Sequence, residues 1–125
     1  MRGAVLDTGA LVGFERNDRR VVAIVARALD HGDTLFVPAG VVAQAWRDGT
    51  RQTRLARLLR STLCDVVVLD DYGARAAGQL CGATDTADVV DSSVVVAARE
   101  RRVRIITSDP NDLRRLDRHV DLVAI

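Results

Sequence analysis

The chain has 125 residues, of which 48% are hydrophobic and 28% are charged, and its formal net charge is +1 at pH 7. This length suits one domain with its own core, and the composition excludes a disordered chain, which would have fewer apolar residues and a larger net charge. A net charge near zero also excludes a global basic field, so contacts with nucleic acid must come from local groups. We expect a single domain over residues 1–125.

Short β-branched runs alternate with longer segments of helical period, which is typical of a parallel sheet flanked by helices. Gly32 is expected to close the first of these helices, and Pro38 to end the second strand. Each strand is short and mostly apolar, as in strands covered on both faces. The predicted elements, in chain order, are a strand at 3–7, a helix at 19–29, a strand at 34–37, a helix at 50–63, a strand at 65–69, helices at 72–80 and 87–102, and strands at 103–107 and 120–123.

No stretch of the sequence is typical of a membrane span or an export signal. The longest apolar runs, such as 94–98, are far shorter than the roughly 20 residues that cross a bilayer as a helix. The chain also begins directly with a strand-like segment and lacks the apolar core of a signal peptide. We therefore expect a cytoplasmic protein without a membrane partner.

Three aspartates are expected where parallel α/β sheets bind ligands, beyond the carboxyl ends of the strands. Asp7 ends the first predicted strand, and Asp109 follows the fourth by two residues. Asp91 lies early in the helix that leads into that fourth strand. Asp88, three residues before Asp91, is expected to share its helix face, where the two negative charges repel.

This repulsion favours a bound cation. At about 4 Å and an effective dielectric constant near 20, two like charges repel by on the order of 4 kcal/mol, enough to protonate one carboxyl group or recruit a cation. A site of carboxylate oxygens alone suits Mg²⁺ or Mn²⁺ rather than zinc, and such ions assist phosphodiester hydrolysis. The residues alone leave a second interpretation open, in which these aspartates are helix caps, turn residues and solvated charges.

Three segments embed these aspartates in apolar runs: VLDTGALV at 5–12, ADVVDSSVVVAA at 87–98 and IITSDPNDL at 105–113. Together they resemble the three hallmark blocks of PIN domains, and they are most similar to those of the VapC-type toxins. The resemblance spans essentially the whole chain in the right order. It implies a PIN-like three-layer α/β/α domain with a short, mostly parallel central sheet.

The resemblance also implies a function: Mg²⁺- or Mn²⁺-dependent endonucleolytic cleavage of cellular RNA by a toxin that a cognate antitoxin neutralises. A homodimer is implied in the same way. Thr107 is expected to orient the site by a hydrogen bond. The implied catalytic metal ligands are Asp7, Asp91 and Asp109, with Asp88 and Asp112 as outer helpers.

One position departs from the family pattern. The segment at 37–47 resembles the one in which the family usually supplies a glutamate, but the matching residue here is Gln44. An amide offers a carbonyl oxygen without charge, so divalent metal should bind less tightly. Glu15 and Asp48 do not occupy the matching place. The alternative function is therefore a catalytically weakened PIN-like module that binds RNA or an antitoxin.

Arginines recur at spacings of three and four between residues 47 and 60, so they form a basic stripe if this segment is helical. They are either phosphate contacts or the solvated face of an amphipathic helix. The candidates for RNA binding are Arg47, Arg51 and Arg54.

Two other enzyme classes also place an aspartate after a strand. The segment LDTGA at 6–10 is similar to the Asp-Thr-Gly loop of retroviral-type aspartic proteases, but those enzymes are β-rich, whereas this chain is predicted to be mostly helical. Phosphotransfer domains need either a second aspartate, where this chain has Gly9, or a lysine, and the sequence contains none. Both classes fit poorly.

Overall fold

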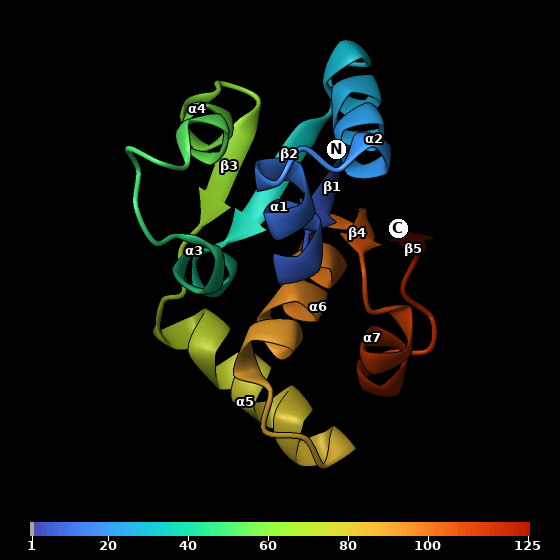
Figure 1. Cartoon of the computed structure of the whole chain (residues 1–125). Helices are drawn as coiled ribbons and strands as arrows, with labels where there is room; N and C mark the ends of the chain where they lie inside the picture. The colour runs from blue at the N-terminus through green and yellow to red at the C-terminus, as the bar shows by residue number, and fades with distance from the viewer. Residues whose placement is uncertain (1) are drawn as a thin grey trace.

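The computed structural model describes residues 2–125, so Met1, the first residue of the predicted domain, lies outside the described part. The described residues form a sheet surrounded by helices (Figure 1). The strands are β1 (Gly3–Leu6), β2 (Thr34–Pro38), β3 (Cys64–Val67), β4 (Arg104–Thr107) and β5 (Leu122–Ala124). The helices are α1 (Thr8–Glu15), α2 (Arg19–Asp30), α3 (Ala39–Ala45), α4 (Thr53–Arg60), α5 (Asp71–Thr84), α6 (Val89–Arg101) and α7 (Pro110–Leu116).

The sheet has five strands in the order β3-β2-β1-β4-β5, and every pairing is parallel. The prediction of a mostly parallel sheet is confirmed. The chain moves from β1 to β2 to β3 in one direction and from β4 to β5 in the other, so the topology switches between β1 and β4. Ligands of open parallel sheets bind at the carboxyl ends of the strands at such a switch point.

Helices cover both faces of the sheet (Figure 1). On one side α1 contacts β1 and β4, α2 contacts β2, and α4 contacts β3. Right-handed crossovers in opposite directions lie on opposite faces, so α6, which contacts β2, β1 and β4, belongs to the other layer together with α5 and α7. Helix α3 contacts both α1 and α6, and it therefore lies between the two layers. The expected three-layer α/β/α architecture is confirmed.

The core lies between the central strands and these helices. Val5 of β1 and Ile105 of β4 are register partners, and both are fully buried, as are Val94 and Val95 of α6. Central strands covered on both faces have no polar face, which explains their continuous apolar runs. None of the helices in residues 2–125 has the length and apolar character needed to cross a membrane.

Local signals at the helix ends explain part of the agreement between sequence and structure. Gly32 has a φ of 74°, which is the left-handed conformation that glycine adopts without strain, and it follows the last turn of α2 as predicted. Pro38 is the last residue of β2, also as predicted. The sequence pattern does not predict α1, α3 or α7, which span eight residues or fewer and lack the regular alternation of leucines and arginines that marks α4, a helix of the same length as α1.

Candidate active site

Asp7 is the most buried acidic group at the carboxyl end of the sheet, with 4% of its surface exposed. It follows β1 directly and caps α1: its Oδ1 accepts a hydrogen bond from the backbone N–H of Ala10 at 2.8 Å. Its Oδ2 accepts a hydrogen bond from the hydroxyl group of Thr107. Burial raises the pKa of Asp7, although these two hydrogen bonds oppose the shift. The hydrogen bonds therefore fix the carboxylate in place, but they do not fully offset the cost of burying its negative charge.

Thr107 connects Asp7 to Asp109. It is the last residue of β4 and is fully buried, and its Oγ1 accepts a hydrogen bond from the backbone N–H of Asp109 at 2.8 Å while its hydroxyl donates to Asp7. The charge of Asp109 contributes to the raised pKa of Asp7, so the two carboxylates interact. The expected orienting role of Thr107 agrees with these contacts.

The start of α1 packs closely against the loop that follows β4. A Cβ atom built on Gly9 would lie 1.7 Å from Oγ of Ser108. Any side chain at residue 9 would push the two segments apart, and with them Asp7 and Asp109. The glycine of the VLDTGALV segment therefore permits this close approach.

Asp88 and Asp91 lie at the start of α6. Asp88 is the N-cap residue, and its Oδ1 accepts a hydrogen bond from the backbone N–H of Asp91 at 3.0 Å. Asp88 therefore lies next to Asp91 as expected, but it precedes the helix instead of belonging to it, because its short acceptor side chain satisfies a free N–H of the first turn. The predicted repulsion is present: burial first, and then the neighbouring charge of Asp88, raise the pKa of Asp91 to about 7.

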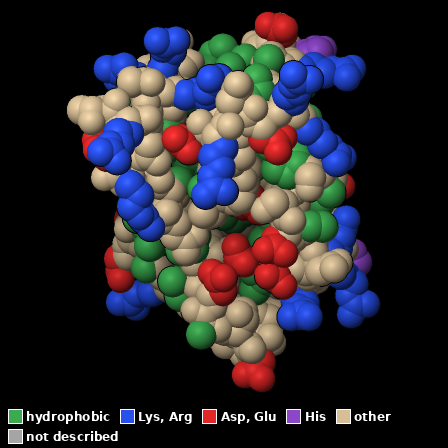
Figure 2. All heavy atoms as spheres, viewed as in Figure 1, with side chains coloured by type: hydrophobic (Ala, Val, Ile, Leu, Met, Phe, Trp, Pro, Cys, Tyr) green, Lys and Arg blue, Asp and Glu red, His purple; other side chains and the backbone are tan. Residues whose placement is uncertain are grey.

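Asp7 and Asp112 also contribute to this raised pKa, so carboxylates from the ends of β1, α6 and α7 share one region. Figure 2 shows acidic side chains gathered in one group over α6 and α7, while arginines predominate in the upper half of that face. Among Asp7, Asp88, Asp91 and Asp109, none has an ion pair within residues 2–125. In the same part of the chain, no three His, Cys, Asp or Glu side chains are already placed to hold a metal ion together.

A comparison with known families identifies this arrangement. The model of the PIN domain family matches residues 4–119. The chain belongs to the PIN domain family. The family predicted from the three sequence segments is thus confirmed.

Solved structures show the same fold at low sequence identity. FitAcB from Neisseria gonorrhoeae has a TM-score of 0.67 and 17% identity, with 95% of each chain covered. A toxin-antitoxin complex from Klebsiella pneumoniae has a TM-score of 0.71 and 14% identity, with 98% of this chain and 97% of that chain covered. FitAB bound to the IR36 DNA fragment has a TM-score of 0.69 and 16% identity, with 97% and 94% covered. Among curated proteins, none is similar enough to this sequence to count as a match.

Gln44, where the family pattern has a glutamate, lies on α3 and contacts the residue that follows Asp7. Its Oε1 accepts a hydrogen bond from the hydroxyl group of Thr8, the residue after Asp7. Neither Glu15 nor Asp48 supplies the missing carboxylate at this position of the PIN domain. Glu15 ends α1, at the opposite end of that helix from Asp7, and Asp48 is engaged by Thr50 and Arg51.

The predicted basic stripe is not continuous, because α4 begins only at Thr53 and the residues before it form a loop. Gln52 holds this loop: its Oε1 accepts hydrogen bonds from the backbone N–H groups of Arg47 at 2.7 Å and Asp48 at 3.0 Å. The helix expected over 50–63 is present but shorter, over Thr53–Arg60, and the condition for a continuous arginine stripe starting at Arg47 is not met.

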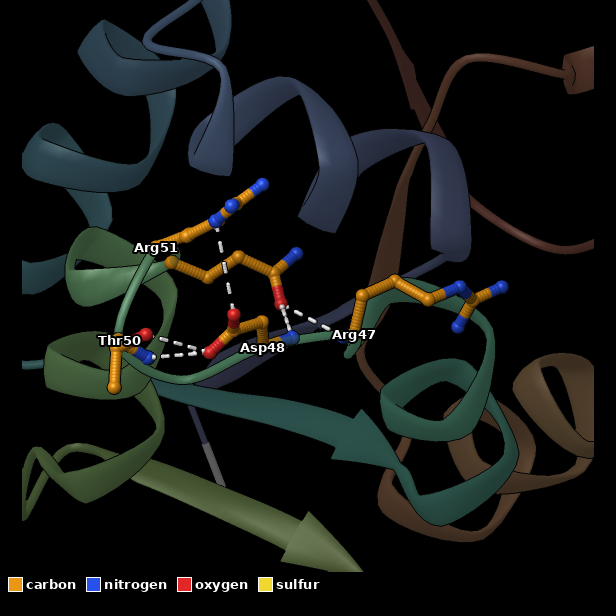
Figure 3. Close-up of polar contacts among 5 residues, drawn as sticks. Arg47, Asp48, Thr50 and Arg51 are labelled. Atoms are coloured by element: carbon orange, nitrogen blue, oxygen red, sulfur yellow. Dashed lines mark hydrogen bonds and ion pairs between the residues drawn. The ribbon is translucent and has the colours of Figure 1, made fainter.

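The arginine side chains of the loop already have partners within the PIN domain. The guanidinium group of Arg47 donates to the backbone carbonyls of Ala43 and Trp46. Arg51 forms an ion pair with Asp48 at 3.8 Å (Figure 3). Arg54 lies on α4 and is exposed. Binding of RNA by Arg47, Arg51 and Arg54 remains a prediction, and these contacts favour Arg54 over the other two.

Proposed function

We propose that this PIN domain is a VapC-type toxin of a toxin–antitoxin pair, which cleaves cellular RNA endonucleolytically in the cytoplasm. The observation that carries the proposal is the convergence of unpaired carboxylates at the switch point between β1 and β4, around the buried Asp7. One of the solved structures with this fold is a toxin–antitoxin complex, which supports an antitoxin as the partner. A homodimer is part of the proposal because the VapC-type resemblance implies it.

The side chains of this site suit a hard divalent cation in their chemistry. All the candidate ligands are carboxylates, which are the preferred ligands of Mg²⁺ and Mn²⁺, and their mutual repulsion leaves negative charge that a cation would neutralise. Asp7, Asp91 and Asp109 would hold the ion, with Asp88 beside them. Asp109 is exposed and makes no capping hydrogen bond to α7, so its side chain can rotate towards the fixed carboxylate of Asp7, whereas Asp88 is held by its hydrogen bond from the backbone N–H of Asp91. When bound, such an ion lowers the pKa of water and stabilises charge on phosphate oxygens.

The test is cleavage of total RNA by the purified protein. We expect discrete fragments in Mg²⁺ or Mn²⁺, intact RNA after chelation, and renewed cleavage when Mn²⁺ is added in excess of the chelator. Fragments that persist in the chelator would exclude metal-dependent cleavage. Sequencing of the cut ends would then identify the RNA.

A second function, a weakened PIN-like module that binds RNA or an antitoxin, is favoured by two observations. Gln44 contributes no negative charge beside Asp7, and residues 2–125 contain no group of acids already placed around a metal. RNA that stays intact in both ions, together with retained binding of RNA or antitoxin, would support this function over the nuclease.

Replacing Gln44 by glutamate separates the two functions further. The hydroxyl group of Thr8 can donate to a carboxylate as it does to the amide oxygen, so Gln44→Glu keeps this contact and adds one negative charge near Asp7. We expect Mn²⁺ to bind about tenfold more tightly, because ligand charge tunes the affinity of such sites. Titration calorimetry with Mn²⁺ checks this, with Gln79→Glu on the exposed part of α5 as the control for net charge. Equal effects of both substitutions would place Gln44 outside the metal site.

A further inference from the structure

A cavity of about 270 Å³ lies beside the candidate active site, between the loop joining α5 to α6 and helix α7. It shares Asp88 and Asp91 with that site, so a molecule in the cavity would reach the carboxylates proposed to hold the metal. The cavity is lined by Thr84, Asp85, Thr86, Asp88, Asp91, Asp112, Arg115 and Leu116.

The charges of this lining are strongly unequal. Four of the lining side chains are aspartates, and Arg115 is the one basic residue among them. RNA carries a negative charge at every phosphate, so the four carboxylates repel it, and a divalent ion offsets only part of that repulsion. Entry of an RNA strand into this cavity therefore depends on additional positive charge, which only Arg115 supplies from the lining.

The contacts of Arg115 differ from those of its neighbour on α7. Arg114 donates hydrogen bonds to the backbone carbonyls of Arg118 at 3.1 Å and Val120 at 2.7 Å, so it holds the chain that follows the helix. Arg115 has only an ion pair with Asp112, at 3.9 Å, among the contacts found in residues 2–125, and its side chain is 82% exposed. An exposed pair of this kind contributes little to stability, so the guanidinium group is available to a ligand.

We propose that Arg115 binds a backbone phosphate of the RNA, next to the phosphodiester that is cleaved. This inference rests on the proposed nuclease function. It also gives the path of the RNA strand away from the metal site, which would run between α7 and the α5–α6 loop. Guanidinium groups suit phosphate because they donate two parallel hydrogen bonds to it. The loop before α4 is a weaker candidate for this path, because Arg47 and Arg51 are already engaged there.

The experiment compares steady-state cleavage of one RNA oligonucleotide by wild type, Arg115→Ala and Arg115→Lys over a range of salt concentrations. We expect Arg115→Ala to raise KM about tenfold and to leave kcat nearly unchanged, because the contact exists before and during the reaction. The slope of log(kcat/KM) against log[salt] should become shallower by about 0.7, the value for one phosphate contact on a single strand. Arg115→Lys keeps the charge and should keep the slope.

The matched control is Arg75→Ala. Arg75 also lies on a helix and forms an exposed ion pair within its own turn, with Asp71 at 3.1 Å, but it does not line the cavity. We expect Arg75→Ala to behave as wild type. Affinity for Mn²⁺ without RNA should be the same in all four proteins.

The outcomes separate the two proposals. If wild type binds Mn²⁺ and cleaves RNA but Arg115→Ala matches Arg75→Ala in KM and salt slope, Arg115 does not bind the strand. The same conclusion follows if Arg115→Ala changes the Mn²⁺ affinity as much as it changes KM, since the residue would then act through the metal site. If wild type neither binds Mn²⁺ nor cleaves RNA, the nuclease function fails, and the role of Arg115 fails with it.

Discussion

Replacing Asp7 by alanine is expected to reduce RNA cleavage by on the order of a thousandfold or more. Metal assistance provides several kcal/mol of transition-state stabilisation, and each 1.36 kcal/mol corresponds to about a factor of ten in rate. Asp7 is the only buried carboxylate of the group, and it is held by Thr107 and Ala10. Without the carboxylate of Asp7, the remaining exposed aspartates have no fixed ligand with which to complete a metal site. Cleavage of a labelled RNA by the purified variant measures the loss.

The control for this substitution must account for the helix cap that Asp7 also provides. Loss of an aspartate N-cap costs about 1 kcal/mol of stability, whatever its effect on chemistry. Asp18 caps α2 in the same way, accepting hydrogen bonds from the backbone N–H groups of Arg20 and Val21. We expect Asp18→Ala to lower the melting temperature and to retain cleavage. Cleavage at the wild-type rate by Asp7→Ala would remove Asp7 from the active site.

The second large effect is on pH dependence. Burial and the charge of Asp88 raise the pKa of Asp91 to about 7, so the folded protein keeps this proton over a range in which the unfolded chain, with a pKa near 3.8, has lost it. The native state then binds more protons, so the free energy of unfolding falls as pH rises from about 4 to 7. Because water reaches the half-buried carboxyl group, we expect a loss of about 1–2 kcal/mol.

Urea unfolding in the presence of a chelator, at pH 5 and pH 8, measures this loss. Burial also raises the pKa of Asp7, which acts in the same direction. Hydrogen bonds from Thr50 lower the pKa of Asp48, and Arg99 lowers the pKa of Asp117 against the effect of burial. Both carboxyl groups are therefore ionised throughout pH 5 to 8, and they do not change the free energy of unfolding in that range. Asp91→Asn should flatten the dependence. A stability that rises between pH 5 and 8 would contradict the proposed carboxylate repulsion.

The same proton links pH to metal binding. A cation must displace the proton of Asp91, so affinity for Mn²⁺ should fall about tenfold for each pH unit below 7 and level off above it. Mn²⁺ added at pH 8 should restore the stability that the metal-free protein loses.

Much of the fold could be predicted because its central strands β1, β2 and β4 are buried on both faces. A strand such as β1 has no polar position to obscure its apolar run, and its end is marked by Asp7. Short helices could not be predicted in this way. Helix α3 has seven residues, and it is held by contacts with α1, β2 and α6 that no local pattern encodes.

The candidate site was predictable to a similar extent. Positions after strands identify Asp7 and Asp109, since the topology of a parallel sheet brings strand ends together. The spacing of the arginines would carry a stripe back to Arg47 only if residues 47–52 were helical. They form a loop held by hydrogen bonds from the backbone to Gln52, and no sequence pattern reveals these bonds. The role of Asp88 as N-cap depends on where α6 begins, and helix boundaries are poorly defined by period alone.

Anomalous diffraction from a crystal soaked in Mn²⁺ tests the metal site most directly. We expect a single strong peak, or a close pair, at the carboxyl end of β1 and β4, with oxygens of Asp7, Asp91 and Asp109 as its ligands. A fully soaked crystal with no peak there, or with Mn²⁺ bound only elsewhere on the molecule, would contradict the proposal that these carboxylates form a metal-dependent nuclease site.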